Sequence, residues 1–232
     1  MKLQPLRPTL LSCRQIDDVN EALGRGLIGD GFDVARHRSL GLVTVDQDDS
    51  AHIALDEATK HAAVDVVFAH SFYAGAAHAS GPLSGEMLGV VAGQDPDEVA
   101  EALWVIKQHL AEVVCFQTLA DRPQPSSAFL AHVVTETGSY LSTVAGVAPG
   151  DPIAYLIAPP MEALVAVDAA LKAAPVTLRQ FIKAPSETNF SGAFLAGSLA
   201  DLQAARDAFV DAVADVVARP LHAARRPARL RR

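Results

Sequence analysis

The sequence predicts an α/β protein of the two-layer α+β type, in which one structural unit occurs twice in tandem. Ile53–Val64 aligns with Val165–Val176 at a constant shift of 112 residues, and six of the twelve positions are identical. The identical pairs are Ala54/Ala166, Asp56/Asp168, Ala58/Ala170, Lys60/Lys172, Ala62/Ala174 and Val64/Val176. Self-similarity at a fixed spacing indicates a duplicated unit, and alternating strand-like and helical patterns favour layers of both.

One difference between the two copies suggests where function lies. The first copy contains the acidic stretch Asp46-Gln47-Asp48-Asp49, whereas the second has Ala158-Pro159-Pro160 at the matching positions. The acidic side chains are therefore a property of the first unit only.

The first unit is expected to begin with a helix over Cys13–Gly24. Ile16, Val19 and Leu23 would share one face of that helix, and glycine favours a helix end. A longer helix is predicted over Asp95–Val114, because an Asp-Pro pair supplies an N-cap and a first-turn proline. Between them we expect a strand at Leu40–Val45, a polar loop at Gln47–Ala51, a short strand at His52–Leu55, a helix at Glu57–Ala63 capped by Asp56, and strands at Val64–Phe68 and Glu86–Ala92.

The proline-rich stretch Leu119–Ser127 is the predicted linker, which gives a first domain over residues 1–120 and a second over 121–218. In the second unit we expect a helix at Phe129–Val144, a strand at Ile153–Ala158, a strand-then-helix passage at Glu162–Ala174, a loop at Pro185–Asn189, a short strand at Phe194–Ala196 and a helix at Asp201–Ala218. Residues 219–232 contain six arginines and no acid, which predicts a disordered basic tail.

Composition argues against several classes of protein. The formal net charge is −8 although the last residues are basic, so the body is acidic and nucleic acid is not the expected partner. No apolar run reaches the roughly 20 residues of a membrane helix, and no membrane association is expected. Two cysteines make no disulfide framework, which favours the reducing cytoplasm as the location.

Three motifs suggest ligand sites, but each lacks a feature that such a site requires. Gly24–Gly29 matches the glycine pattern of dinucleotide sites, but a helix is predicted before it rather than a strand. Asp46, Asp48 and Glu57 have the spacing of a calcium loop, but Ala51 replaces the required glycine. The histidines between His52 and His78 lack zinc-site spacing. We therefore expect no metal, no cofactor and no enzymatic activity, with acid–base catalysis by paired carboxylates as the remaining catalytic alternative.

Three long segments resemble the EutL family, the shell proteins of ethanolamine-utilization bacterial microcompartments. They are RSLGLVTVDQDDSAHIALDEATKHAAVDVVFAHSFYAGAAHASGPLSGE from Arg38, FLAHVVTETGSYLSTVAGVAPGDPIAYLIAPPMEA from Phe129 and APSETNFSGAFLAGS from Ala184. The resemblance covers roughly residues 5–220 and implies a tandem duplication of a circularly permuted bacterial microcompartment domain. It also implies a homotrimer with pseudo-sixfold symmetry that tiles with other shell proteins, carries gated pores and binds ethanolamine in its small pores.

The resemblance further implies which residues line the ethanolamine site: Asp48, Asp49, Glu86, Phe116, Thr188, Asn189 and Phe190. Carboxylates would neutralise the ammonium group, a phenyl ring would offer its face, and amide and hydroxyl groups would serve the alcohol. For each residue a simpler interpretation stays open: a solvated turn for the Asp pair, an ion pair for Glu86, the core for Phe116 and turn capping for Thr188 and Asn189. Phe190 stands where the family is expected to have tyrosine. A binding or sensor module of the same fold is the alternative function.

Overall fold

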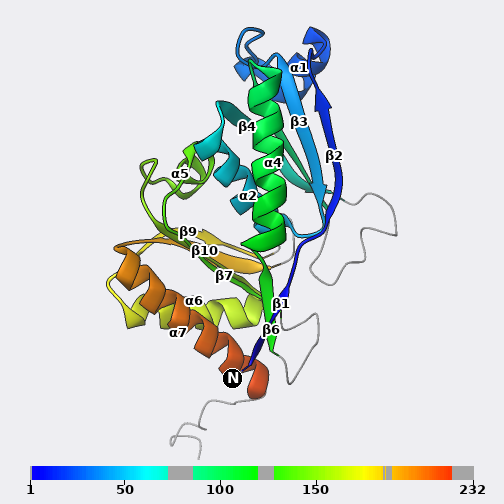
Figure 1. Ribbon diagram of the computed structural model, residues 1–232. Helices are drawn as coiled ribbons and strands as arrows, with labels where there is room; N and C mark the ends of the chain where they lie inside the picture. Colours follow the sequence, from blue (N-terminus) through cyan, green and yellow to red (C-terminus); the bar gives the residue numbers. More distant parts are fainter. Residues whose placement is uncertain (1, 73–85, 120–127, 185, 187–189, 221–232) are drawn as a thin grey trace, which may run out of the picture.

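The structure, a computed structural model, describes residues 2–72, 86–119, 128–184, 186 and 190–220. Within these residues the chain forms two four-stranded antiparallel sheets and one two-stranded ribbon, and helices pack on the sheets (Figure 1). Most of the predicted linker and residues 221–232 of the predicted tail lie outside the described part.

The first sheet has the strand order β2 (Leu10–Ile16), β3 (Ser39–Val45), β5 (Glu86–Gly93), β4 (Val64–Phe72). Helices α2 (Asp48–His61) and α4 (Pro96–Glu112) cover one face, and α1 (Glu21–Ile28) with the short 3-10 helix Gly29–Gly31 covers the other. Val43 and Val91 point towards α2 and α4, whereas Leu40 and Val90 point towards α1. A sheet covered on both faces needs strands that are apolar on both sides, as β3 and β5 are.

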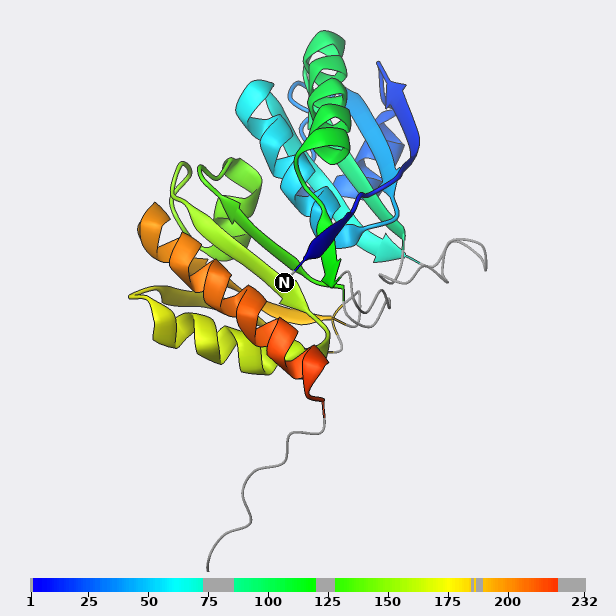
Figure 2. The same ribbon diagram turned by 60° about the horizontal axis from the view of Figure 1, so that its bottom comes forward.

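The second sheet has the equivalent order β7 (Leu130–Val134), β8 (Ile153–Ala158), β10 (Ser191–Ala196), β9 (Thr177–Ile182). Its outer face carries α6 (Pro160–Ala173) and α7 (Leu199–Ala218), which lie side by side in Figure 2. The helix α5 (Ser139–Ala145) and the first unit lie against its inner face.

Both units follow the order strand, helix, strand, helix, strand, strand, helix, which confirms the predicted repeat and α/β fold class. Helices α2 and α6 each have 14 residues and begin at Asp48 and Pro160, the shift of 112 found in the sequence. Strands β1 (Leu3–Leu6) and β6 (Phe116–Leu119) pair in the ribbon, so the start of the chain lies beside the end of the first unit.

One hydrophobic core runs through both units. Leu55 and Ile106 of the first unit belong to the same buried cluster as Tyr155 and Phe194 of the second. A separate cluster lies between the second sheet and its two outer helices. Helix α2 is therefore shared: it covers its own sheet and also packs on the neighbouring unit, as the close approach of α2 to α5 in Figure 1 shows.

Several predicted elements are confirmed by the structure: the strands at Leu40–Val45, Val64–Phe68, Glu86–Ala92, Ile153–Ala158 and Phe194–Ala196, and the helices at Asp95–Val114 and Asp201–Ala218, each within a few residues. The cap of α4 is as expected, because the side chain of Asp95 accepts a hydrogen bond of 3.0 Å from the backbone N–H of Asp97.

The helix predicted over Cys13–Gly24 is wrong. Cys13 and Ile16 belong to β2, which pairs with β3, and the helix begins only at Glu21 after the N-cap Asn20. The apolar spacing in this stretch fits a helix, but pairing with β3 overrides it. The helix predicted over Phe129–Val144 is wrong for the same reason, since its first part is β7 and Gly138 precedes the short α5.

The start of α2 was also predicted wrongly. Gln47–Ala51 is not a polar loop and His52–Leu55 is not a strand, because a continuous helix begins at Asp48. Asp56 lies inside that helix and does not cap it. In the second unit, Glu162–Ala174 contains no strand, since α6 begins at Pro160. Acidic residues and proline are both favourable in the first turn of a helix, as at the starts of α2 and α6.

Candidate functional site

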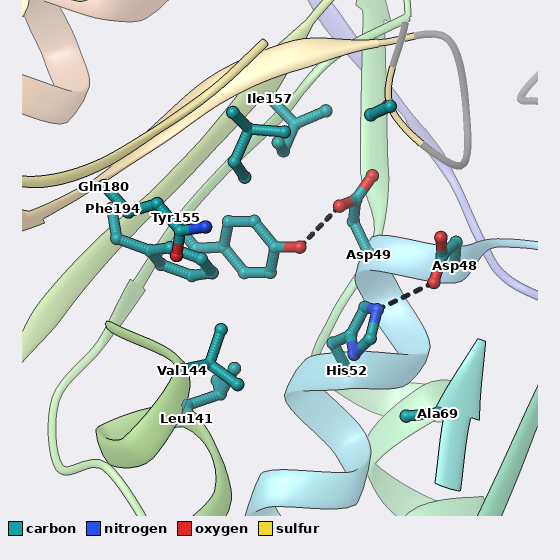
Figure 3. Close-up of a pocket in the computed structure, with 12 residues that line it drawn as sticks. Asp48, Asp49, His52, Ala69, Leu141, Val144, Tyr155, Ile157, Gln180 and Phe194 are labelled. Atoms are coloured by element: carbon teal, nitrogen blue, oxygen red, sulfur yellow. Dashed lines mark hydrogen bonds and ion pairs between the residues drawn. The ribbon is translucent and has the colours of Figure 1, made fainter. Parts of the chain in front are cut away.

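A pocket with a volume of about 250 Å³ lies where the first unit meets the second. The first turns of α2 form one wall, α5 forms another, and the inner face of the second sheet closes it (Figure 3). The lining residues are Asp48, Asp49, His52, Ala69, Leu141, Val144, Tyr155, Ile157, Gln180, Ile182, Ser186 and Phe194. The two acids are the only ones among them.

Asp48 and Asp49 lie in the first turn of α2, which follows the strand β3 after the two residues Asp46 and Gln47. The unpaired N–H groups and the dipole of a helix N-terminus favour negative charge at this point. The two residues are only 5% and 6% exposed. The interpretation of the pair as a solvated turn is therefore wrong, and both carboxyl groups are held between the units.

The two carboxyl groups have different partners. Asp48 accepts a hydrogen bond of 2.5 Å from the Ser71 hydroxyl, and its Oδ1 lies 2.9 Å from Nε2 of His52, one turn further along the helix. His52 Nδ1 in turn lies 2.6 Å from the hydroxyl of Tyr140 on α5. Asp49 Oδ1 accepts a hydrogen bond of 2.5 Å from Tyr155 on β8. The other oxygen of Asp49 is buried and has no hydrogen-bond partner in the described part of the chain.

These different surroundings give the carboxyl groups of Asp48 and Asp49 different pKa values. Burial raises the pKa of Asp48, but the charge and hydrogen bond of His52, with Ser71 and His70, outweigh burial and leave the pKa below its ordinary value. Burial and the charge of Asp48 raise the pKa of Asp49 to about 7, against the opposing hydrogen bond from Tyr155. Burial, followed by the charges of Asp49 and Asp48, raises the pKa of Tyr155 well above its usual range. Near neutral pH the negative charge therefore resides mainly on Asp48.

Of the other residues expected in the site, Glu86, Phe116 and Phe190 do not line this pocket. Glu86 begins β5 opposite Phe72, one residue beyond the Ser71 that binds Asp48, and it is buried. Phe116 and Phe190 are buried with ring centres 5.8 Å apart, in the core that both units share. Thr188 and Asn189 lie outside the described residues.

The sequence did not indicate His52 or Tyr155 as site residues. His52 follows Asp48 by four residues, a spacing that brings side chains together once the segment is recognised as a helix. Tyr155 is 106 residues away from Asp49 and becomes its neighbour only through the packing of the two units. No signal in the sequence alone pairs these two residues.

Neither a metal centre nor a membrane helix is found in the part of the chain that the structure describes. No three His, Cys, Asp or Glu side chains there are grouped so that they could hold a metal ion. Of the helices described, none is both long and apolar enough to cross a bilayer.

Comparisons with known proteins agree with this architecture. The BMC domain family matches residues 39–122. The bacterial microcompartment shell protein EutL of Salmonella typhimurium is 47% identical over 223 residues, which cover 96% of this chain and 99% of that protein. A crystal structure of EutL from Clostridium perfringens has a TM-score of 0.86 at 45% identity, over 96% of this chain and 98% of that one. The trimeric shell protein PduB, with a TM-score of 0.74 at 16% identity over 89% and 88% of the two chains, shares the fold.

Identity at this level over nearly the whole length, together with the same tandem fold, confirms the resemblance found in the sequence. The chain is a member of the EutL family of bacterial microcompartment shell proteins.

Proposed function

We propose that this chain forms a homotrimeric, pseudohexameric tile that assembles with other shell proteins, and that gated pores in the tile pass metabolites. We further propose that a small pore within each chain binds ethanolamine through Asp48, Asp49, Glu86, Phe116, Thr188, Asn189 and Phe190, without catalysis. The observation that carries this proposal is the buried acid pair between the units, with one carboxylate oxygen that no described residue serves.

A small ammonium ion suits this acid pair. A buried carboxylate needs a counter-charge or hydrogen-bond donors, and the ammonium group supplies both in a volume that fits a small pocket. Phe116 and Phe190 do not line the pocket, but their rings belong to the same buried cluster as the pocket residues Tyr155 and Phe194, and an aromatic face attracts a cation.

The assembly proposal is supported by a comparison of α2 with its repeat α6. In α2, the residues Asp49 and Ile53 face the second unit and are buried. The equivalent residues of α6, Met161 and Val165, are 65% and 45% exposed, and Leu164 beside them is 56% exposed. A second copy of this chain can cover them with its first unit and so repeat the contact found within the chain. Three two-unit chains in a ring then give six similar units, with domains proposed at 1–120 and 121–218.

Two measurements test the proposal. Light scattering at micromolar concentration should give about 73 kDa, three times the 24.4 kDa of one chain. Calorimetry should detect ethanolamine binding that weakens about 10-fold or more in Asp48→Asn and Glu86→Gln, because each loses a charged hydrogen-bond acceptor. Asp168→Asn is the matched control, since this residue is the repeat partner of Asp56 and is 63% exposed. A monomer in light scattering would contradict the proposed trimer. The absence of binding heat with ethanolamine would contradict the proposed ligand site.

Pore function and sensing make different demands on affinity. A pore must release what it binds, so the affinity for a permeant should be weak. Asp49 is 6% exposed, and a ligand must displace protein contacts to reach it. If ethanolamine binds with micromolar or tighter affinity, and its binding leaves the permeation of metabolites unchanged, the sensor function is favoured instead.

A further inference from the structure

We propose that Asp49 is the proton-carrying member of the acid pair, that binding of an amine cation releases this proton, and that Tyr155 is a positioning residue that holds the carboxyl group of Asp49 and eases the loss of its proton. This inference rests on the proposed amine-binding function. It adds Tyr155, and a proton, to the proposed site between the two units.

The geometry assigns different roles to the two carboxyl groups. Asp48 has two partners, His52 and Ser71, and the imidazole is itself held by Tyr140. Among the described side chains, Asp49 accepts a hydrogen bond from the Tyr155 hydroxyl alone, which occupies one oxygen, while the other oxygen points away from the ring (Figure 3). Two adjacent buried carboxyl groups resist ionising together, and the one with fewer stabilising partners keeps a proton.

The positive charge of His52 favours the ionised form of Asp49, but it is outweighed by burial and by the charge of Asp48. On its own helix Asp49 faces Asp48 and His52; β4 contributes His70 and Ser71, α5 contributes Tyr140, and β8 contributes Tyr155. From β9 and β10 the pocket receives the uncharged Gln180 and Phe194. Among the described lining residues there is no lysine or arginine. The pKa of about 7 for Asp49 agrees with this arrangement.

The binding step can be written as a balanced exchange. An ammonium ion enters, the Oδ2–H of Asp49 gives its proton to the solvent, and the carboxylate formed accepts an N–H from the ammonium. The Tyr155 hydroxyl donates to Oδ1 throughout and keeps the carboxylate aimed at the ligand. One positive charge enters and one leaves, so the buried pair never holds two uncompensated negative charges.

The consequence is a defined pH dependence. With a pKa of about 7, Asp49 holds about 0.9 proton at pH 6 and about 0.1 at pH 8. These are also the protons that binding should release at each pH. Apparent affinity for the amine should rise about 10-fold per pH unit below pH 7 and level off above it.

Calorimetry of ethanolamine binding to the full-length protein tests this, in pairs of buffers with different ionisation enthalpies at pH 6 and pH 8. The observed binding enthalpy is plotted against the ionisation enthalpy of the buffer. The slope of this plot should give about 0.9 proton released at pH 6 and about 0.1 at pH 8 in the wild type. Tyr155→Phe removes the hydrogen bond that favours the charged form, so the midpoint of the affinity profile should move upward in pH. A merely structural role for Tyr155 would change affinity equally at all pH values.

Asp49→Asn provides a test that does not depend on the folding of the Tyr155 variant. It removes the titrating group and should abolish proton release at pH 6 while binding through Asp48 persists. Binding heat without proton release in the wild type at pH 6 would overturn the role of Asp49 and leave the amine function intact. The amine function itself would be refuted by the absence of binding at every pH, and this inference would then be refuted with it.

Discussion

Replacing Asp56 with alanine is expected to destabilise the fold strongly, although Asp56 belongs to neither sheet. Its carboxylate is 1% exposed and accepts hydrogen bonds from the backbone N–H groups of Gly138, at 2.8 Å, and Leu141, at 2.7 Å. The side chain of one unit thereby caps the start of α5 in the other. Each buried donor left without an acceptor costs about 1–3 kcal/mol, so the loss of both hydrogen bonds should cost about 2–6 kcal/mol.

The repeat provides the matched control. Asp168 is the equivalent residue in the second unit, but it is 63% exposed and pairs with Lys172 four residues further on. Asp168→Ala should change the free energy of unfolding by no more than about 0.5 kcal/mol, because exposed ion pairs contribute little. The same residue type at the same repeat position should therefore give two very different results.

Thermal unfolding followed by circular dichroism, at one protein concentration for all variants, measures this difference. For a chain of this size the Asp56→Ala variant should unfold about 5–15 °C below the wild type, and Asp168→Ala within about 2 °C of it. Equal shifts for the two variants would refute the reasoning, because the cap on α5 would then contribute nothing measurable.

The remaining predictions concern pH, assembly and packing. The pKa of Asp49 is raised to about 7, so the stability due to its proton is complete below about pH 4 and is lost as the pH rises through 7. Asp49→Asn should therefore exceed the wild type in unfolding free energy at pH 8, by on the order of 3 kcal/mol, and match it at pH 4. Leu164→Asp places a charge on the exposed face of α6 and should reduce the mass in light scattering towards 24.4 kDa; a persisting trimer would argue against that face as the contact. Gly192→Ala should unfold the second sheet, since a Cβ would lie 1.9 Å from the carbonyl oxygen of Leu156, whereas Gly26→Ala meets nothing within 4 Å and should fold normally.

The sequence predicted the repeat and the central strands well, because these depend on local patterns. Runs such as Ile153–Ala158 are apolar throughout and are buried throughout. Strand β9 was missed because Thr177–Ile182 lies at a sheet edge, is mostly exposed and does not alternate apolar and polar residues. The β7 and β2 segments show that pairing with a distant strand decides structure where local preference is weak.

Of the residues that line the candidate site, the sequence indicated only the two acidic ones. The sequence draws attention to Asp48 and Asp49 as acids present in one repeat only, but it predicts a loop for them, because a run of acids usually lies in solvent. What buries them is the second unit, and no local pattern reports a partner 106 residues away such as Tyr155. The contrast between Asp56 and Asp168 has the same origin: identical residues in repeated segments acquire different roles from what packs on them.

The acids at the start of α2 occur at the contact between the two halves of one chain, whereas α6 brings Met161 and Leu164 to the corresponding position. In a closed ring of three chains, contacts of these two kinds alternate around the circle. A cation that binds at the acidic contact would act on every second contact in such a ring and leave the apolar contacts unchanged. Any motion that it sets off would then repeat every 120°, a symmetry that a ring of six identical single-unit chains has no reason to adopt.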